Sequence, residues 1–289
     1  MHRRASRMNV PSRPSWVALC ALGLASGCSW IRSVLSPSSP AEAIAEFSLS
    51  VPSLDGAKRL DLWATYFRTH QAEHDSAGIA LLSIDGKPLG VRLSTRDFCQ
   101  AAMDGAVRVV SRSGSRTFGF AGLGDEPQTD CSARFPKQPA IARTRFAVAR
   151  GEYGDGAGSR TLVPLRSIAV DRRVIPIGSV VFVPAARGIP VTRPDGREVR
   201  HDGYFFAATT GGAIDGRKID VFLGPLERNP FAFVRSSKRG TFEAFIIEAS
   251  DLAERFEALH GRLSPAIASD DDDRGGRPVW SSRAWAAPW

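Results

Sequence analysis

In this 289-residue chain, the residues that could do proton chemistry are an aspartate and the glycine-rich turn before it. The aspartate lies in a predicted strand where polar and apolar residues alternate. Asp220 lies between Ile219 and Val221 in the sequence KIDVF, so its carboxyl and its apolar neighbours occupy opposite faces of the strand. The turn TTGGAIDG covers residues 209–216. A strand carboxyl that burial keeps protonated is a general acid, whereas the bare pattern is also typical of a solvent-facing aspartate.

The segment 169–224 and one earlier strand resemble the three-aspartate (3D) domain of bacterial cell-wall proteins. AVDRRVIPIG matches the motif of the first aspartate, TTGGAIDG the glycine-rich turn that normally carries the second, and KIDVF the motif of the third. Ala64-Thr65-Tyr66 is similar to the threonine-bearing first strand of such domains. The family includes the C-terminal part of membrane-bound lytic transglycosylase A, and the resemblance implies a six-stranded double-psi β-barrel.

The resemblance also assigns roles to individual positions. It implies that Asp220 is the catalytic acid and that Thr65 supports it through a hydrogen bond. Asp171 falls on the first aspartate and either supports the site or caps a short helical turn. The second aspartate is replaced by a threonine. The turn residues expected to contact substrate, through side chains or through glycine backbone, are Thr209, Thr210, Gly211 and Gly212.

By this resemblance the protein is a peptidoglycan lytic transglycosylase that cleaves the MurNAc-GlcNAc bond. A glycoside hydrolase normally uses two carboxylates. A lytic transglycosylase needs one, because the C6 hydroxyl of the muramic acid itself attacks C1 and gives 1,6-anhydromuramic acid. Asp220 can therefore act first as the acid and then as the base, and no cofactor is expected.

The threonine at position 209 leaves other functions open. A nearby carboxylate would help to raise the pKa of Asp220 and a hydroxyl does not, so burial must supply the shift. The same replacement motivates the alternative, a non-catalytic peptidoglycan-binding module. A third hypothesis is a hydrolase that pairs Asp220 with Asp171 or Asp202, although HDGYF is typical of a turn at Asp202.

The N-terminus has the pattern of an export signal that ends at a lipid-modified cysteine. Four arginines precede the uncharged stretch WVALCALGLASG, residues 16–27, which is too short to span a membrane. Cys28 follows small residues, as in a lipobox, and Ser29 after it implies outer-membrane sorting. We expect a periplasmic protein anchored in the outer membrane by this lipid, with ordinary cleavage nearby as the alternative.

The charge of the chain bears on its partner. The 38 basic and 30 acidic residues give a net charge of +8, and loss of the four signal arginines lowers it to about +4. A mildly positive exported protein suits an anionic envelope polymer, here the glycan strands of peptidoglycan. Nucleic acid is not expected in that compartment, and the sequence does not show whether a protein partner exists.

Two cysteines, Cys99 and Cys131, remain after the signal. In an oxidising compartment such a pair predicts one disulfide. The histidines are scattered, and HExxH and paired CxxC sequences are absent, so no metal site is expected. The motifs of serine and cysteine nucleophiles are absent as well.

Short runs rich in β-branched and aromatic residues, separated by turn signals such as Asp85-Gly86, predict a mainly β chain with few short helices. The best helix candidates cover residues 94–105 and 252–259. A long segment without 3D motifs divides the barrel, and we interpret it as an inserted subdomain that walls one side of a glycan groove. The expected domains are a signal peptide (1–28), a flexible tether (29–53), a first barrel segment (54–74), the inserted subdomain (75–150), the 3D-type double-psi barrel (151–262) and a disordered tail (263–289).

Overall fold

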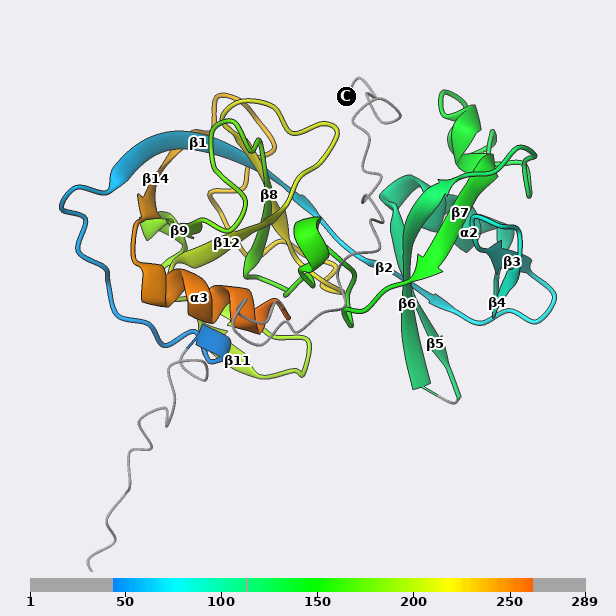
Figure 1. Ribbon diagram of the computed structural model, residues 1–289, viewed down its shortest axis with the longest axis horizontal. Coiled ribbons are helices and arrows are strands. Elements are labelled where there is room, and N and C mark those ends of the chain that lie inside the picture. Colours follow the sequence, from blue (N-terminus) through cyan, green and yellow to red (C-terminus); the bar gives the residue numbers. More distant parts are fainter. Residues whose placement is uncertain (1–43, 113, 262–289) are drawn as a thin grey trace, which may run out of the picture. The chain divides into compact units, whose positions relative to one another are not determined.

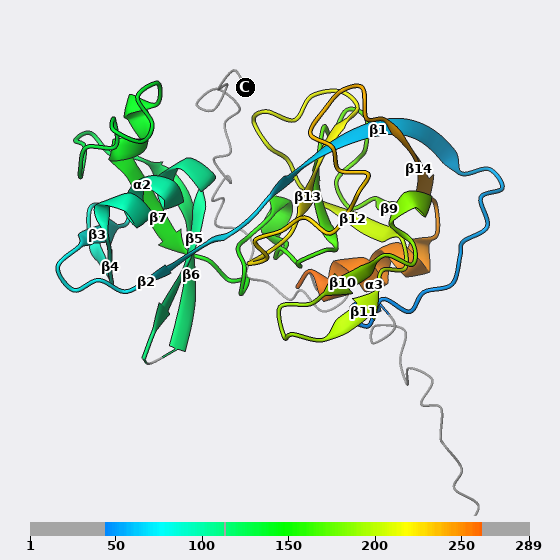
Figure 2. The same ribbon diagram turned by 180° about the vertical axis from the view of Figure 1, so that it is seen from behind.

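The computed structural model describes residues 44–112 and 114–261. They include a closed barrel in which hydrogen-bonded neighbours follow the order β1-β13-β8-β12-β9-β14 (Figures 1 and 2). The prediction of a mainly β chain built on a six-stranded barrel, with an insertion and few short helices, is confirmed. The barrel strands are β1 (Lys58–Phe67), β8 (Ser167–Val170), β9 (Val180–Phe182), β12 (Tyr204–Thr209), β13 (Lys218–Phe222) and β14 (Phe242–Ile247).

The barrel mixes two parallel strand pairs with four antiparallel ones. β1 pairs with β13, and β8 with β12, in parallel, whereas the other neighbours are antiparallel. β1 changes partner midway, because its residues 58–62 pair with β14 and its residues 63–67 pair with β13. One strand thereby joins two parts of the barrel wall.

Alternation along the strands fills the barrel interior. Leu60, Leu62 and Ala64 of β1 are buried there, and every other barrel strand contributes apolar residues to the same cluster. The intervening residues of β1 lie on the outer face. Part of the outer face is covered by α3 (Ser250–Leu259), whose Phe256 ring stacks on Phe206 of β12 with centroids 5.7 Å apart.

The fold begins earlier than the expected boundary at residue 54. Ile44 and Phe47 are buried, and they lie within the segment predicted to be a flexible tether. Nη2 of Arg166 donates to the Ile44 carbonyl at 2.6 Å, and the same guanidinium lies 3.8 Å from the centre of the Phe47 ring. The tether prediction is wrong for these residues, because two apolar anchors in a polar segment bind a partner more than 100 positions away.

The inserted subdomain contains a four-stranded sheet, a hairpin and a helix, and it falls in the same compact unit as the barrel. Its first strand is β2, which pairs with β5 and not with the barrel, so the insertion starts at His70 and not at residue 75. The order in the sheet is β2-β5-β6-β7. Its elements are β2 (His70–Glu73), β3 (Ile79–Leu82), β4 (Pro88–Leu93), α2 (Thr95–Asp104), β5 (Ala106–Ser111), β6 (Gly114–Leu123) and β7 (Thr144–Val148).

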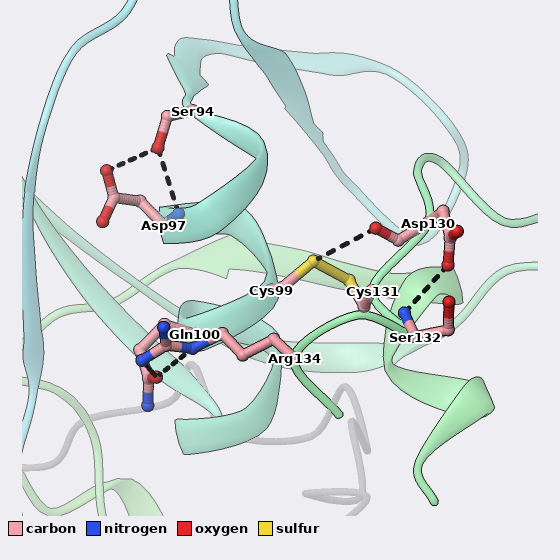
Figure 3. Close-up of a disulfide and its surroundings, with 8 residues drawn as sticks. All are labelled: Ser94, Asp97, Cys99, Gln100, Asp130, Cys131, Ser132 and Arg134. Atoms are coloured by element: carbon pink, nitrogen blue, oxygen red, sulfur yellow. Dashed lines mark hydrogen bonds between the residues drawn. A yellow bond between two sulfur atoms is a disulfide. The ribbon is translucent and has the colours of Figure 1, made fainter. Parts of the chain in front are cut away.

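The helix α2 lies within the helix candidate 94–105 and has a capping residue at each end. The Ser94 hydroxyl accepts a hydrogen bond from the Asp97 backbone N–H at 3.1 Å, and Gly105 ends the helix at φ 77°. Cys99 of α2 forms a disulfide with Cys131 (Figure 3). Closing this loop contributes about 3 to 4 kcal/mol in the chain-entropy model.

The remaining elements are short. No helix of the described residues is long and apolar enough to cross a membrane. The signal sequence, the lipidation position Cys28 and the tail 263–289 lie outside the described residues. Besides the elements above, the chain forms the 3-10 turns η1 (Pro139–Arg143), η2 (Ala157–Ser159) and η3 (Pro184–Ala186) and the hairpin of β10 (Pro190–Thr192) and β11 (Glu198–Arg200).

Candidate functional site

A row of residues crosses four neighbouring barrel strands at the level of Asp220. Thr65 of β1 is the register partner of Asp220 on β13, which in turn pairs with Ala169 of β8. Ala169 pairs with Thr209 of β12, after a bulge that shifts the register. Because Ile219 and Val221 point into the barrel core, the Asp220 carboxyl projects from the outer face of the wall.

Asp220 is poorly solvated and poorly paired. Its side chain is 18% exposed, and its Oδ1 atom is buried without a hydrogen-bond partner among the described residues. The nearest cation is the ammonium of Lys218, with 3.8 Å between Nζ and Oδ1. Burial raises the pKa of Asp220 to about 6, and the charge of Lys218 opposes that rise.

Aromatic rings lie on either side of this carboxyl along β1 and β13. Phe67 and Phe222, the next outward-facing register pair, have ring centroids 4.8 Å apart. On the other side, Lys218 pairs with Trp63 and its ammonium lies 5.5 Å from the centre of the indole ring. The acid is therefore flanked by apolar surface, which accounts for its weak hydration.

Asp220 opens onto a pocket of about 710 Å³. Such a volume is in the range of small-molecule and cofactor sites. Residues of the barrel and of the insertion both line it. The lining residues include Phe67, Ala169, Thr209, Thr210, Gly211, Gly212, Ile214, Asp220 and Phe222 from the barrel side and Met103, Asp104, Gly105, Gly119, Phe120, Ala147, Val148 and Arg150 from the insertion side.

Two further carboxylates line the pocket, and the sequence did not indicate them. Asp104 stands at the end of α2, where it accepts a hydrogen bond from Gln100 at 2.8 Å and burial raises its pKa. Asp155 accepts from the backbone N–H groups of Arg150 and Gly151 at 2.9 to 3.1 Å, so it closes a turn. Neither belongs to a motif, and their position follows from packing between distant segments.

The hydrogen bonds of Asp171 give it a structural role. Its carboxylate accepts from the guanidinium of Arg173 at 2.7 Å and from the Gly216 backbone N–H at 2.8 Å. The Arg173 guanidinium holds the pKa of Asp171 well below its usual range, with help from the backbone N–H groups of Arg173 and Gly216. Asp171 thus caps the turn after β8 and ties it to the turn that precedes β13.

Thr65 and Thr209 lie near the acid without bonding to it. Within the described residues no side-chain hydrogen bond joins Thr65 to Asp220, although the two are register partners. The Thr209 hydroxyl instead donates to the Thr210 carbonyl at 3.3 Å. The pKa of Asp220 therefore rises through burial, the cause that the sequence required once the motif carboxylate was replaced.

The glycine-rich turn contributes backbone to the pocket wall. Neither Gly211 nor Gly212 has a positive φ, so the turn does not need these glycines for a left-handed backbone conformation. A Cβ on Gly211 would lie 3.0 Å from Cγ1 of Ile214. Close packing of the turn on itself explains this glycine.

Asp202 does not line the pocket, and its carboxylate is occupied by hydrogen bonds to other residues. Its carboxylate forms two hydrogen bonds to the Arg166 guanidinium, at 2.6 and 2.8 Å, and accepts the backbone N–H groups of Leu49 and Tyr204. It precedes β12, whereas Thr209 ends that strand. A pairing of Asp202 with Asp220 in one reaction has no support in this geometry.

Comparison with known proteins supports the sequence motifs. Residues 166–229 match the family model of the 3D domain. The chain carries a 3D domain. The matched region contains Asp171, Thr209 and Asp220, and the suspected resemblance is confirmed. No curated protein sequence matches the chain.

Similar solved structures are lytic transglycosylases at low identity. E. coli MltA with bound chitohexaose has 15% identity and a TM-score of 0.44, with 66% of this chain and 74% of that chain covered. The membrane-bound lytic murein transglycosylase from Agrobacterium tumefaciens has 16% identity and a TM-score of 0.39, with 73% and 80% covered. LtgG of Burkholderia pseudomallei has 18% identity and a TM-score of 0.37, with 65% and 71% covered.

Proposed function

We propose that the protein is a peptidoglycan lytic transglycosylase that uses Asp220 as its one acid and base. The observation that carries this proposal is a carboxyl with a pKa of about 6 and an unpartnered oxygen, opening onto a 710 Å³ pocket in a 3D domain. An acid of this pKa keeps part of its proton near neutral pH, as general acid catalysis requires.

The reaction needs no second carboxylate and no added water. The proton of Asp220 passes to the glycosidic oxygen between MurNAc and GlcNAc as the C1–O bond breaks. The Asp220 carboxylate then takes the proton of the muramic acid C6 hydroxyl while the oxygen of that hydroxyl bonds to C1. The product is 1,6-anhydromuramic acid, Asp220 is protonated again, and no cofactor is required.

The surroundings of the other motif carboxylates favour this single-acid mechanism over hydrolysis. Asp171 is held by Arg173 and Gly216, and Asp202 by Arg166, so neither is free to activate water. Thr209 contributes a hydroxyl to the pocket wall, and we expect it, with the backbone of Thr210 and its neighbouring glycines, to contact the glycan. Asp171 acts on the site by fixing the turn before β13.

We further propose that the protein works in the periplasm as an outer-membrane lipoprotein. The disulfide between Cys99 and Cys131 fits an oxidising compartment. The anchor is proposed at Cys28, with the rest of the signal removed. Peptidoglycan strands are the partner that this location supplies.

The deciding experiment is mass analysis of fragments released from purified peptidoglycan. The natural protein should release fragments one water lighter than hydrolysis products, with activity falling as the pH rises above about 6, since Asp220 then loses its proton. Asp220→Asn should release at least a thousandfold less while still sedimenting with insoluble peptidoglycan.

Asp104→Asn is the matched control, because it removes the other pocket carboxylate whose pKa is raised. It should still give anhydro products. Reducing ends from the natural protein, lost in Asp104→Asn, would indicate a two-carboxylate hydrolase instead. Binding to peptidoglycan without any release would identify a glycan-binding module, the function that the threonine at position 209 favours.

A further inference from the structure

Lys218 is a charged residue of the KIDVF motif to which neither the sequence resemblance nor the proposed reaction assigns a role. It starts β13, two positions before Asp220, so the two side chains leave the strand on the same face. Its side chain is 12% exposed. A lysine this deeply covered has a fixed location, unlike the mobile lysines of a solvated surface.

Three contacts hold the Lys218 ammonium. It donates to the Ala213 carbonyl of the glycine-rich turn at 3.3 Å. It lies 5.5 Å from the centre of the Trp63 ring, within the range of a cation–π contact. Its third neighbour is Oδ1 of Asp220 at 3.8 Å, the oxygen that has no hydrogen-bond partner.

We propose that Lys218 is a positioning residue for Asp220: the Lys218 ammonium acts on the carboxyl through its charge and stabilises the carboxylate that remains after the proton has been delivered. This inference rests on the proposed function for its catalytic part. At 3.8 Å the ammonium is close enough to favour the carboxylate and too far to hold it in a short ion pair. Asp220 can therefore lose its proton in the first half of the reaction and regain it in the second.

The other charges around the pocket have partners or lie on other elements. Past the end of β8, Asp171 is paired with Arg173, and on β1 Asp61 is paired with Arg59. Lys218 is the charge that lowers the pKa of Asp220 against the effect of burial. The further charged residues lining the pocket are Arg68, Asp104, Arg150 and Asp155.

The test compares Lys218→Met, which keeps an apolar stem beside Trp63, with Lys218→Arg, which keeps the charge. The pKa of the Asp220 carboxyl is followed directly by carbon NMR, and the pH dependence of anhydro-product release is followed in parallel. We expect Lys218→Met to raise that pKa, and the alkaline limb of the activity profile, by about one pH unit. Lys218→Arg should return both to within a few tenths of a unit.

Arg217→Met is the matched control, because it removes a neighbouring positive charge that is 64% exposed and lies 4.0 Å from Asp61. It should leave both measurements unchanged. An Asp220 pKa that is the same in Lys218→Met and in the natural protein would overturn the inference, even in an active enzyme. A shifted NMR titration in a protein that releases no product would support the Lys218–Asp220 coupling and refute the proposed reaction.

Discussion

Asp202 and Asp220 are both largely removed from solvent in the same barrel, and their surroundings are opposite. Asp202, with 2% of its side chain exposed, is bonded to both terminal nitrogens of Arg166. Within residues 44–112 and 114–261, Asp220 has one buried oxygen without a hydrogen bond and an ion-pair partner, Lys218, at 3.8 Å. The first arrangement joins the N-terminal segment to β12, and the second leaves a proton that can be exchanged. Burial alone therefore does not tell the role of a carboxylate. A close counter-charge indicates a structural role, and the lack of one leaves the group available for proton transfer.

The largest effect should come from breaking the structural pair. Arg166→Met would leave the Asp202 carboxylate buried without its counter-charge, which destabilises a fold by about 3 to 5 kcal/mol. Urea unfolding at pH 7 measures the change. Arg59→Met, which breaks an exposed pair with Glu243, should change stability little. A loss below about 1 kcal/mol for Arg166→Met would show that water reaches this pair and that the contrast is weaker than the structure indicates.

Loss of the Asp220 carboxylate should have the opposite effect on stability. The folded-state pKa of Asp220 is raised to about 6, above its ordinary value of 3.8, so ionisation opposes folding and stability is lost as the pH rises between these values. Asp220→Asn should therefore stabilise the protein by about 3 kcal/mol at pH 7.5 and have little effect at pH 3.5. Thermal unfolding at both pH values checks this. An equal effect at the two values would mean that ionisation of Asp220 is not the cause.

A smaller effect should follow from restoring the carboxylate that the 3D motif normally carries. Thr209 and Asp220 are separated in the row by Ala169, that is by two strand spacings of about 4.8 Å each. At that distance, Thr209→Asp should raise the alkaline limb of the pH–activity profile by about half a unit through like-charge repulsion. Thr209→Asn, which lacks the charge, is the control. Indistinguishable profiles for the natural protein and Thr209→Asp would contradict the idea.

The parts of this molecule that the sequence predicts are those encoded by local alternation. KIDVF places the Asp220 carboxyl opposite two core residues, and the β-branched or aromatic runs AVRVVS and YFFAAT form the strands at 106–111 and 204–209. The cap at Ser94 and the stop at Gly105 define α2 in the same local way. The same alternation would also have placed Lys218 beside Asp220.

The parts that escaped prediction depend on contacts between distant segments. β6 contains glycines and polar residues, and it is a strand because β5 and β7 pair with both its edges. Ile44 and Phe47 lie in a polar segment and become part of the core through Arg166. Asp104 enters the pocket from a helix that no 3D motif contains.

The change of partner along β1 has a consequence for the order of folding. Strand β1 is complete after residue 67, but both of its partner strands lie beyond residue 217. Strand β1 can therefore pair only after that later part of the chain has been synthesised. The insertion can form earlier, because strands β2 to β7 pair among themselves within residues 70–148. Non-local pairing of this kind slows folding and leaves strand edges exposed during synthesis. The strand that supports the acid is thus made early and enclosed late, so the barrel and its site form only after nearly the whole chain is present.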